Sequence, residues 1–281
     1  MEEPYRVDEP YQEGPPPAAL RDTVQCVWSA RARADDDPEA AVLPDGCSDV
    51  IWSPGLEPWV AGPDTGPVRE SLVTGSLVVG VRFRPGAAPP VLGDDLTALR
   101  DARPRLAQLW RSDVVRRLMD QLEGARDVAG AQALLLAAIA AHRSRPPDPV
   151  ATGSVGRILG AVAAGRRIAH GGDGALGSRQ HRRRFRAAVG YGPKTFERIA
   201  RFQRFRRLAR LARAGGGDGG VAALAAACGY ADQAHLAREC RRLAGRPPSA
   251  LLGRRAPASE GAGAGSESFK RPAASVPTLA R

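Results

Sequence analysis

The sequence predicts an α+β N-terminal domain, built as a small β-rich barrel or sandwich with helices, followed by an all-helical domain. Up to about residue 90, short apolar runs are separated by Gly and Pro turns, which is typical of small β structures. From about Asp94 onward, apolar residues recur every three or four positions, which is the helical period. The charge also divides the chain. Residues 1–150 hold 16 Lys/Arg and 23 Asp/Glu, a balance of −7, whereas residues 151–255 hold 22 and 5, a balance of +17.

The boundary between the two domains is predicted at SRPPDP (144–149), where prolines interrupt the helical pattern and the charge changes sign. The final stretch is rich in Ala, Gly and Ser, a composition that cannot bury enough apolar surface to fold. We therefore expect an N-terminal regulatory or oligomerisation domain over 1–145, a linker over 146–153, a helical domain over 154–253 and a disordered tail over 254–281.

A hairpin is predicted early in the N-terminal domain. AVLPDGCSDVIW (41–52) reads as a strand, an Asp45-Gly46 turn and a second strand, because this dipeptide favours tight hairpin turns. PWVAGPDTGPV (58–68) adds a short strand followed by turns. Before them, Pro17 is placed to begin a short helix through AALRDTVQCVW.

An alternating strand and an apolar helix complete this domain. At the end of 71–86, one face carries apolar residues and the other is basic: Val79, Val81 and Phe83 against Arg82 and Arg84. DVAGAQALLLAAIAAHR (127–143) predicts a strongly apolar helix, which should pack inside its domain or between subunits. It is our candidate for a dimer or interdomain contact.

The second half predicts helices over 154–166, 178–190 and 194–214. The last of these has an apolar stripe of Phe196, Ile199, Phe202, Phe205, Leu208, Ala209 and Ala212. Its phenylalanines, with Phe185, could stack on nucleic-acid bases, but their helical spacing favours core packing.

The stretch VAALAAACGYADQAHLARECRRLAGRPPSALL (221–252) predicts two helices around a tight Gly229-Tyr230 turn, the second opened by Asp232. One face of the second helix is apolar, and the other carries Gln233, His235, Arg238, Arg241 and Arg242. An apolar helix that supports a basic one through a glycine turn is the layout of a helix-turn-helix DNA reader. The basic balance of this half suits a phosphate polymer, because neutralised phosphates release condensed counterions.

GYADQAHLARECRRLAGRPP resembles the second helix-turn-helix of AraC/XylS-type transcription regulators, with its Gly-aromatic turn, polar cap, basic helix and closing G-x-x-P. Upstream, SRQHRRRFRAAVGYGPKTFERIARFQRFRRLA resembles the family's first recognition helix and its connecting helix. The resemblance covers about a hundred residues in the family's order. LPDGCSDVIW, VAGPDT-x-PV and GVRFRPGAAPPVLG also resemble an N-terminal domain that occurs before such DNA-binding pairs.

Carried over by position, the resemblance implies two sets of DNA-binding residues. The base-reading candidates are Arg179, Arg182 and Arg183 in the first unit and Gln233, Ala234, His235 and Arg238 in the second. Arginine can grip guanine with two hydrogen bonds and glutamine can grip adenine, whereas alanine offers only apolar contact. The expected phosphate contacts, which position the protein without reading sequence, are Arg241, Arg242, Arg184, Arg186 and Lys194.

The first unit departs from the family pattern. The segment 166–177, where an apolar supporting helix belongs, contains four glycines, and each interior glycine costs about 1 kcal/mol relative to alanine. His170 and His181 occupy positions where leucine-like residues are expected, and Cys240 replaces the usual phenylalanine of the second core. We therefore expect a weakly folded first unit.

Enzymatic chemistry finds little support in the residues. None of the four histidines lies within residues 1–141, and the four cysteines have no C-x-x-C pairing, so we expect no metal, no cofactor and no enzyme. Four tryptophans could line an apolar ligand pocket, although core packing is favoured: Trp28, Trp52, Trp59 and Trp110. The acidic, proline-rich start lacks the apolar region of a signal peptide, and no run approaches 18 apolar residues. We therefore expect a cytoplasmic protein without a membrane partner.

These observations predict a sequence-specific regulator that binds double-stranded promoter DNA and activates or represses transcription. RNA polymerase is an expected partner, and a small-molecule effector and a homodimer are open alternatives. The main rival is a non-specific nucleic-acid binder whose basic half only coats phosphates. A DNA-repair alkyl-transfer protein is a further rival, but it would need an activated, metal-bound cysteine cluster that the cysteine spacing argues against.

Overall fold

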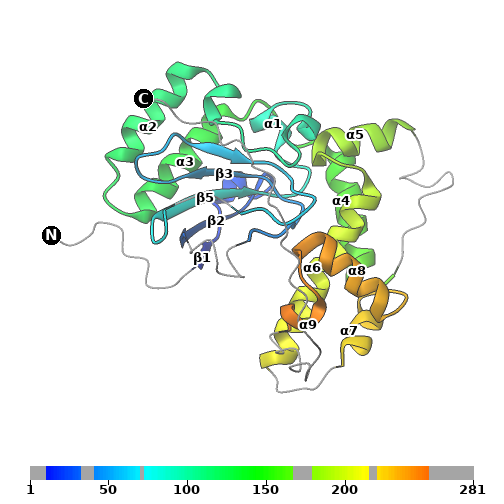
Figure 1. The fold of residues 1–281 in the computed structure, drawn as a ribbon. Helices are drawn as coiled ribbons and strands as arrows, with labels where there is room; N and C mark the ends of the chain where they lie inside the picture. Colours follow the sequence, from blue (N-terminus) through cyan, green and yellow to red (C-terminus); the bar gives the residue numbers. More distant parts are fainter. Residues whose placement is uncertain (1–10, 33–40, 70–72, 167–178, 215–219, 253–281) are drawn as a thin grey trace, which may run out of the picture.

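The computed structural model describes residues 11–32, 41–69, 73–166, 179–214 and 220–252, and Figure 1 shows a sheet-containing part beside a helical part. The first part contains an antiparallel sheet of five strands in the order β1-β2-β5-β3-β4. The strands are β1 (Tyr11–Gly14), β2 (Val24–Arg31), β3 (Asp49–Trp52), β4 (Trp59–Ala61) and β5 (Leu77–Phe83). The sheet is open, with β1 and β4 at its edges. The predicted α+β class is therefore confirmed and the barrel alternative is wrong, whereas a sandwich-like layering is compatible with the sheet.

The alternation of β5 decides which face of the sheet is buried. Leu77, Val79, Val81 and Phe83 lie in the main hydrophobic core, as the alternating pattern predicts. The residues between them lie on the opposite face, where Val78 belongs to a smaller apolar cluster with Cys26, Trp28, Ile51 and Ala61.

On this opposite face, the indole of Trp28 lies across β5. Trp28 is the register partner of Gly80, and a Cβ at Gly80 would lie 2.2 Å from Cε2 of the indole. Because glycine leaves this space open, Trp28 Nε1 reaches over β5 and donates a 2.8 Å hydrogen bond to Asp49 Oδ1 on β3. A side chain thus ties three strands together in addition to the backbone ladder.

Short helices and two longer ones complete this part. They are η1 (Ala18–Leu20), α1 (Pro89–Leu92), η2 (Leu96–Leu99), η3 (Leu106–Gln108), α2 (Ser112–Glu123) and α3 (Val128–His142). α3 packs against α2 and against β5, and Figure 1 shows it along one face of the sheet. Its Ala131, Leu135 and Ile139 are completely buried in the main core. The apolar helix predicted over 127–143 is confirmed, and it packs inside its own domain. Across the described residues, no helix has both the length and the apolar character that crossing a membrane requires.

Two predictions for the N-terminal domain are wrong. The helix expected after Pro17 is only the single turn η1, because Val24 and Val27 belong to strand β2, where pairing with β5 wins over local spacing. The hairpin expected over 41–52 does not form. β3 pairs with β4 and β5, and the segment before it makes only an isolated bridge from Val42 to Val68.

The boundary between the domains also differs from the prediction. α4 (Pro149–Ala163) begins inside the segment 146–153 that was expected to be a linker. Asp148 accepts a hydrogen bond from Val150 N at the N-cap, and Pro149 occupies the first turn. The proline therefore starts a helix here, because its missing N–H and fixed φ suit the first helical position. The tail 254–281 lies outside the described residues.

The second part is helical, as predicted. After α4 come α5 (Arg179–Val189), α6 (Pro193–Ala214), α7 (Val221–Ala227), α8 (Gln233–Ala244) and α9 (Pro248–Leu251). One hydrophobic core joins α4, α5, α6, α7 and α8. The apolar stripe of α6 lies at its centre, and Phe196, Ile199, Phe202 and Phe205 are at most 1 % exposed. With Phe185 equally buried, the phenylalanines pack in the core and are not available for stacking on bases.

The position of α3 predicts the effect of truncating its buried leucine. Leu135→Ala should lower the free energy of unfolding by about 2–5 kcal/mol, because it removes a fully buried side chain and leaves a cavity. Leu134→Ala, at a half-buried neighbour, should cost less. Urea unfolding of both variants measures the difference. A negligible loss for Leu135→Ala, together with a change of mass in light scattering, would instead make α3 a subunit interface.

Candidate nucleic-acid interface

The turn between α7 and α8 is built from a glycine, a buried tyrosine and an aspartate cap. Gly229 has φ of +75°, a left-handed conformation that glycine adopts at no steric cost. Its absent Cβ would lie 3.2 Å from the carbonyl oxygen of Gly165, just after α4, so the turn packs closely on the first unit. Asp232 Oδ1 accepts a 2.6 Å hydrogen bond from His235 N and fixes the start of α8.

The buried side of α8 fixes which side chains face outward. Leu236, Cys240 and Leu243 are at most 2 % exposed and belong to the shared helical core. The exposed residues fall within one half of the helical circumference, given 100° per residue. They are Gln233, Ala234, Arg238, Arg241 and Arg242. The structure therefore leaves five of the predicted DNA-binding residues exposed on the half of α8 that is turned away from the core.

His235 is placed differently from its neighbours. It is half-buried, its ring meets the ring of Tyr230 edge-on at 5.3 Å, and Nδ1 accepts a long 3.4 Å hydrogen bond from Ala231 N. Through these contacts His235 stabilises the turn between α7 and α8. Its base-reading role stays a prediction.

Two arginines of α6 hold this second unit in place. Arg198 makes a two-pronged ion pair with Glu239 on α8, with N–O distances of 2.8 and 2.6 Å. The guanidinium of Arg201 lies over the ring of Tyr230, 5.7 Å from its centroid, and pairs with Glu197. The sequence analysis missed these roles, because a basic residue on a helix gives no local sign that it pairs with a partner 41 positions away.

The first unit presents its basic face on α5. Arg179, Arg182 and Arg183 are exposed, while Phe185 and Val189 are buried, so these three arginines point outward and their base-reading role stays a prediction. Arg186 and Lys194 are exposed as well: the structure leaves both accessible.

Arg184 has an internal partner. It was expected to contact phosphate, but its guanidinium makes two hydrogen bonds, of 2.9 and 2.7 Å, to the carboxylate of Asp148 at the N-cap of α4. It therefore ties α5 to α4 in this structure. The glycine-rich supporting segment, 166–177, lies almost wholly outside the described residues, so the expected weakness of the first unit stays a prediction.

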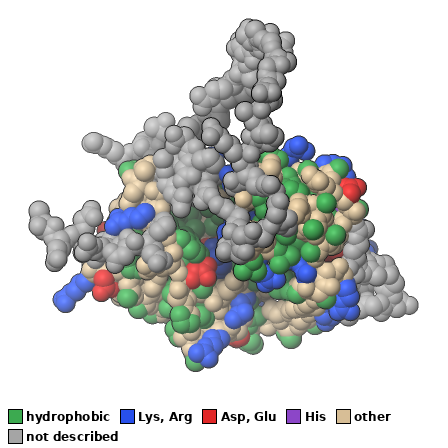
Figure 2. Space-filling view, turned by 90° about the horizontal axis from the view of Figure 1, so that it is seen from below, with side chains coloured by type: hydrophobic (Ala, Val, Ile, Leu, Met, Phe, Trp, Pro, Cys, Tyr) green, Lys and Arg blue, Asp and Glu red, His purple; other side chains and the backbone are tan. Residues whose placement is uncertain are grey.

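Basic side chains are spread over the surface. Figure 2, a view from below, shows Lys and Arg scattered among apolar and other polar side chains on that face, without one continuous basic block. A uniform coat of positive charge is therefore absent from the described part of this face.

The cysteines are buried thiols. Burial raises the pKa of Cys26 to about 11 and that of Cys240 to about 12, and it also raises the pKa of Cys47 and Cys228. At neutral pH these groups are protonated, and the thiol is a far weaker nucleophile than the thiolate. Among the described residues, no group of three or more His, Cys, Asp or Glu could hold a metal ion.

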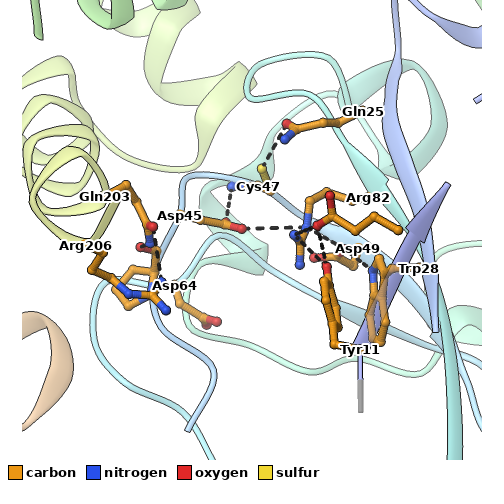
Figure 3. Close-up of polar contacts among 12 residues, drawn as sticks. Tyr11, Gln25, Trp28, Asp45, Cys47, Asp49, Asp64, Arg82, Gln203 and Arg206 are labelled. Atoms are coloured by element: carbon orange, nitrogen blue, oxygen red, sulfur yellow. Dashed lines mark hydrogen bonds and ion pairs between the residues drawn. The ribbon is translucent and has the colours of Figure 1, made fainter. Parts of the chain in front are cut away.

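A second polar cluster lies on the sheet, around Arg82 of β5 (Figure 3). Arg82 Nε is 3.1 Å from Asp49 Oδ1 and 3.6 Å from Asp45 Oδ2. Its Nη1 is 3.5 Å from Glu13 Oε1 and 3.3 Å from the Tyr11 hydroxyl. The cluster thus connects the edge strand β1 with the loop that carries Asp45.

The tryptophans pack in the cores. Trp52 is fully buried, and Trp110 is 4 % exposed, donates a hydrogen bond to Val91 O and stacks on His142. Trp28 is buried against Gly80, and Trp59 is half-buried in the small cluster on the other face. Core packing, the favoured interpretation, is confirmed for three of them and holds in part for Trp59.

Comparison with known families supports this layout. Residues 175–254 match a family described as a helix-turn-helix domain, and residues 12–105 match a domain of unknown function (DUF6597). Neither the curated proteins nor the solved structures contain a match to this chain. The fold and the matched domain make the C-terminal half a helix-turn-helix DNA-binding module. More specifically, the C-terminal half contains an AraC-type helix-turn-helix domain that follows an N-terminal domain of unknown function. This match supports, at the family level, the assignment of the chain as a DNA-binding transcription regulator.

Removing the arginine that holds α8 should weaken the second unit. Arg198→Ala leaves the largely buried Glu239 carboxylate without its hydrogen bonds, so unfolding should become easier by about 1.5–3 kcal/mol. Arg198→Lys, which keeps the charge but loses the two-pronged geometry, should recover part of the loss. Urea unfolding checks both variants. Equal stability of Arg198→Ala and wild type would show that the ion pair contributes nothing to holding α8.

The Arg82 cluster predicts a pH dependence of stability. Burial raises the pKa of Asp49 to about 6, against the opposing effect of Arg82. Because the folded pKa lies above the unfolded value, Asp49 takes up a proton on folding. Its stabilising contribution is complete below the unfolded pKa and is lost as the pH rises through about 6. Relative to Asp49→Asn, which cannot titrate, the wild type should gain stability as the pH falls from 7 to 5.

Urea unfolding of both chains at pH 7, 6 and 5 measures this difference. Glu13, Asp45, Cys26 and Tyr11 face the same cluster and are present in both chains, so the difference between the two chains reports on Asp49. A wild type that loses stability relative to Asp49→Asn over this range would show that Arg82 outweighs burial.

Proposed function

We propose that the protein is a sequence-specific regulator that binds promoter DNA through α8 and α5. One observation carries the proposal: α8 is locked by its apolar side into the shared core, which leaves a glutamine and three arginines together on its exposed face. A glutamine and an arginine on a rigid helix can each make two hydrogen bonds to a base edge in the major groove. Gln233 and Arg238 would read bases, and Arg241 and Arg242 would contact phosphates.

The dimensions of α6 support simultaneous binding by both units. α6 has 22 residues, so it is about 33 Å long at 1.5 Å per residue. Successive major-groove segments on one face of DNA lie about 34 Å apart. Arg179, Arg182 and Arg183 of α5 would enter the second segment, because they are exposed at the N-terminal half of their helix.

The N-terminal domain is proposed to modulate this binding. Modulation requires a signal, such as a small-molecule effector, that binds two states of the domain with different affinity. Recruitment of RNA polymerase and formation of a homodimer belong to the same proposal. The proposal assigns no catalytic step to the chain. The alkyl-transfer rival needs an activated thiolate, and the buried, protonated cysteines argue against it.

The rival with a specific observation in its favour is non-specific binding to nucleic acid, given the balance of +17 over residues 151–255. Several of these charges are engaged inside the protein, at Arg184, Arg198 and Arg201, so the charge that can meet phosphates is smaller than the composition implies. This favours binding directed by particular side chains.

Two arginines of α8 separate the two functions. Arg238→Ala should cost about 1–3 kcal/mol at one base position and relax the preference there. Arg242→Ala should weaken binding to all duplexes alike and lower the salt slope by about one. Fluorescence anisotropy on an enriched duplex and a scrambled one, across a salt series, measures both effects. Arg116→Ala, at an exposed arginine of α2, is the matched control and should change neither.

Equal affinity of the wild type for enriched and scrambled duplexes, with a steep salt slope, would establish the non-specific rival. A uniform loss for Arg238→Ala would make Arg238 a phosphate contact.

A further inference from the structure

One loop of the N-terminal domain, residues 62–67, is held in place by hydrogen bonds and close packing with residues 99–103 of the same domain. Gly62 N donates to Ala102 O, and a Cβ at Gly62 would lie 1.6 Å from Leu99 O, so the chain passes in close contact with that segment. The carboxylate of Asp64 is held by Arg103 through hydrogen bonds of 2.9 and 2.7 Å.

Thr65 adds a further fixed point. The carboxylate of Asp101 accepts a 2.6 Å hydrogen bond from the backbone N of Thr65 and another from the Thr65 hydroxyl. Side-chain and backbone hydrogen bonds therefore fix residues 62–65 on the N-terminal domain. A shift of that domain would move the loop with it.

The first recognition helix ends against this loop. Gly190, directly after α5, has φ of +88°, and a Cβ there would lie 2.4 Å from Cγ of Pro63 and 3.1 Å from the carbonyl oxygen of Leu96. Only a glycine fits this position, for both its conformation and its space. The C-terminal end of α5 is thus seated on Pro63 and η2.

The second recognition helix ends against the same loop. α8 is capped by Gly245, with φ of +67°, and Cγ of Pro67 lies 3.8 Å from its ideal Cβ position. The carbonyl oxygen of Arg242 lies 3.9 Å from the ideal Cβ position of Gly66. Two prolines four residues apart therefore lie beside the glycines that end the two recognition helices, Pro63 tightly against Gly190 and Pro67 near Gly245.

A second contact holds the two domains together beside this loop. Leu43 packs on the helical core, and Gln203 Nε2 of α6 donates a 2.5 Å hydrogen bond to Pro44 O. Gly46, with φ of +89°, lies against the ring of Phe196, which a Cβ would approach to 2.5 Å. Figure 3 shows Gln203 facing the segment that leads to Asp45.

We propose that residues 62–67 set the separation and angle of α5 and α8, and so determine which spacing between two DNA half-sites the protein accepts. The inference rests on the proposed function. The loop holds the C-terminal ends of both helices, whereas the base-reading candidates lie toward their N-terminal ends, which is the end that contacts base edges in helix-turn-helix proteins. The loop is thus a specificity-determining element that acts through the position of the helices.

Selection of duplexes from a random library by the full-length chain tests this role, with a graded pair of variants at Gly66. The wild type should enrich two half-sites at one fixed separation. Gly66→Ala should keep that separation, because 3.9 Å is an ordinary contact for a Cβ. Gly66→Phe adds a large ring beside the carbonyl of Arg242 in the last turn of α8, so it should displace α8 and enrich the same half-sites at a changed or broadened separation. Its affinity for the wild-type spacing should fall about tenfold, the cost of a mismatched site.

Pro67→Ala, at an exposed position, is a second variant that removes the ring beside Gly245 without adding bulk, and it should broaden the accepted separation. Circular dichroism confirms that each variant is folded. If folded Gly66→Phe and Pro67→Ala both select the wild-type separation as sharply as the wild type, the inference is overturned and the proposed function stands. Enrichment of a single half-site would also overturn it, whereas a wild type that enriches no sequence would overturn the proposed function itself.

Discussion

The helical half depends on the burial of one apolar seam along α6. Phe196, Ile199, Phe202 and Phe205 are at most 1 % exposed, and each buried side chain of this size contributes about 1.5–3 kcal/mol. α4 and α5 pack on the seam from the first unit, and α7 and α8 from the second. Since both units share this core, the buried side of each recognition helix is fixed, and so is the side that faces outward.

The arginines of the helical half divide into those that stabilise the fold and those that are exposed on the recognition helices. Arg184, Arg198 and Arg201 form intramolecular ion pairs, the first of them at the surface, and Arg204 donates to the carbonyl oxygens that end α4. The exposed arginines of α5 and α8 have the orientation that contact with DNA requires. Part of the positive charge of this chain therefore stabilises the fold. The net charge alone overstates the number of arginines that can bind nucleic acid.

Sequence reasoning reached the elements whose pattern is local and long. The stripe of α6, the cap at Asp232, the alternation of β5 and the apolar α3 are all readable from spacing. It failed where one local pattern suits two structures. Val24 and Val27 fit a helix face, yet pairing with β5 makes them strand residues.

The remaining errors share one cause, which is that tertiary contacts decide. Asp45-Gly46 is a good hairpin turn, but here Gly46 is needed to approach Phe196 of the other domain. Asp148-Pro149 was read as a break, although the same residues make a helix start. The approach of Pro63 and Pro67 to the helix ends joins segments more than 120 positions apart, so no local pattern could reveal it.

A hydroxyl-radical footprint of the full-length chain on an enriched duplex tests most directly whether both units read DNA side by side. The account predicts two protected backbone stretches on one face of the duplex, with centres about 10–10.5 base pairs apart, one from α5 and one from α8. Uniform protection along the duplex, or a single protected stretch, would contradict it.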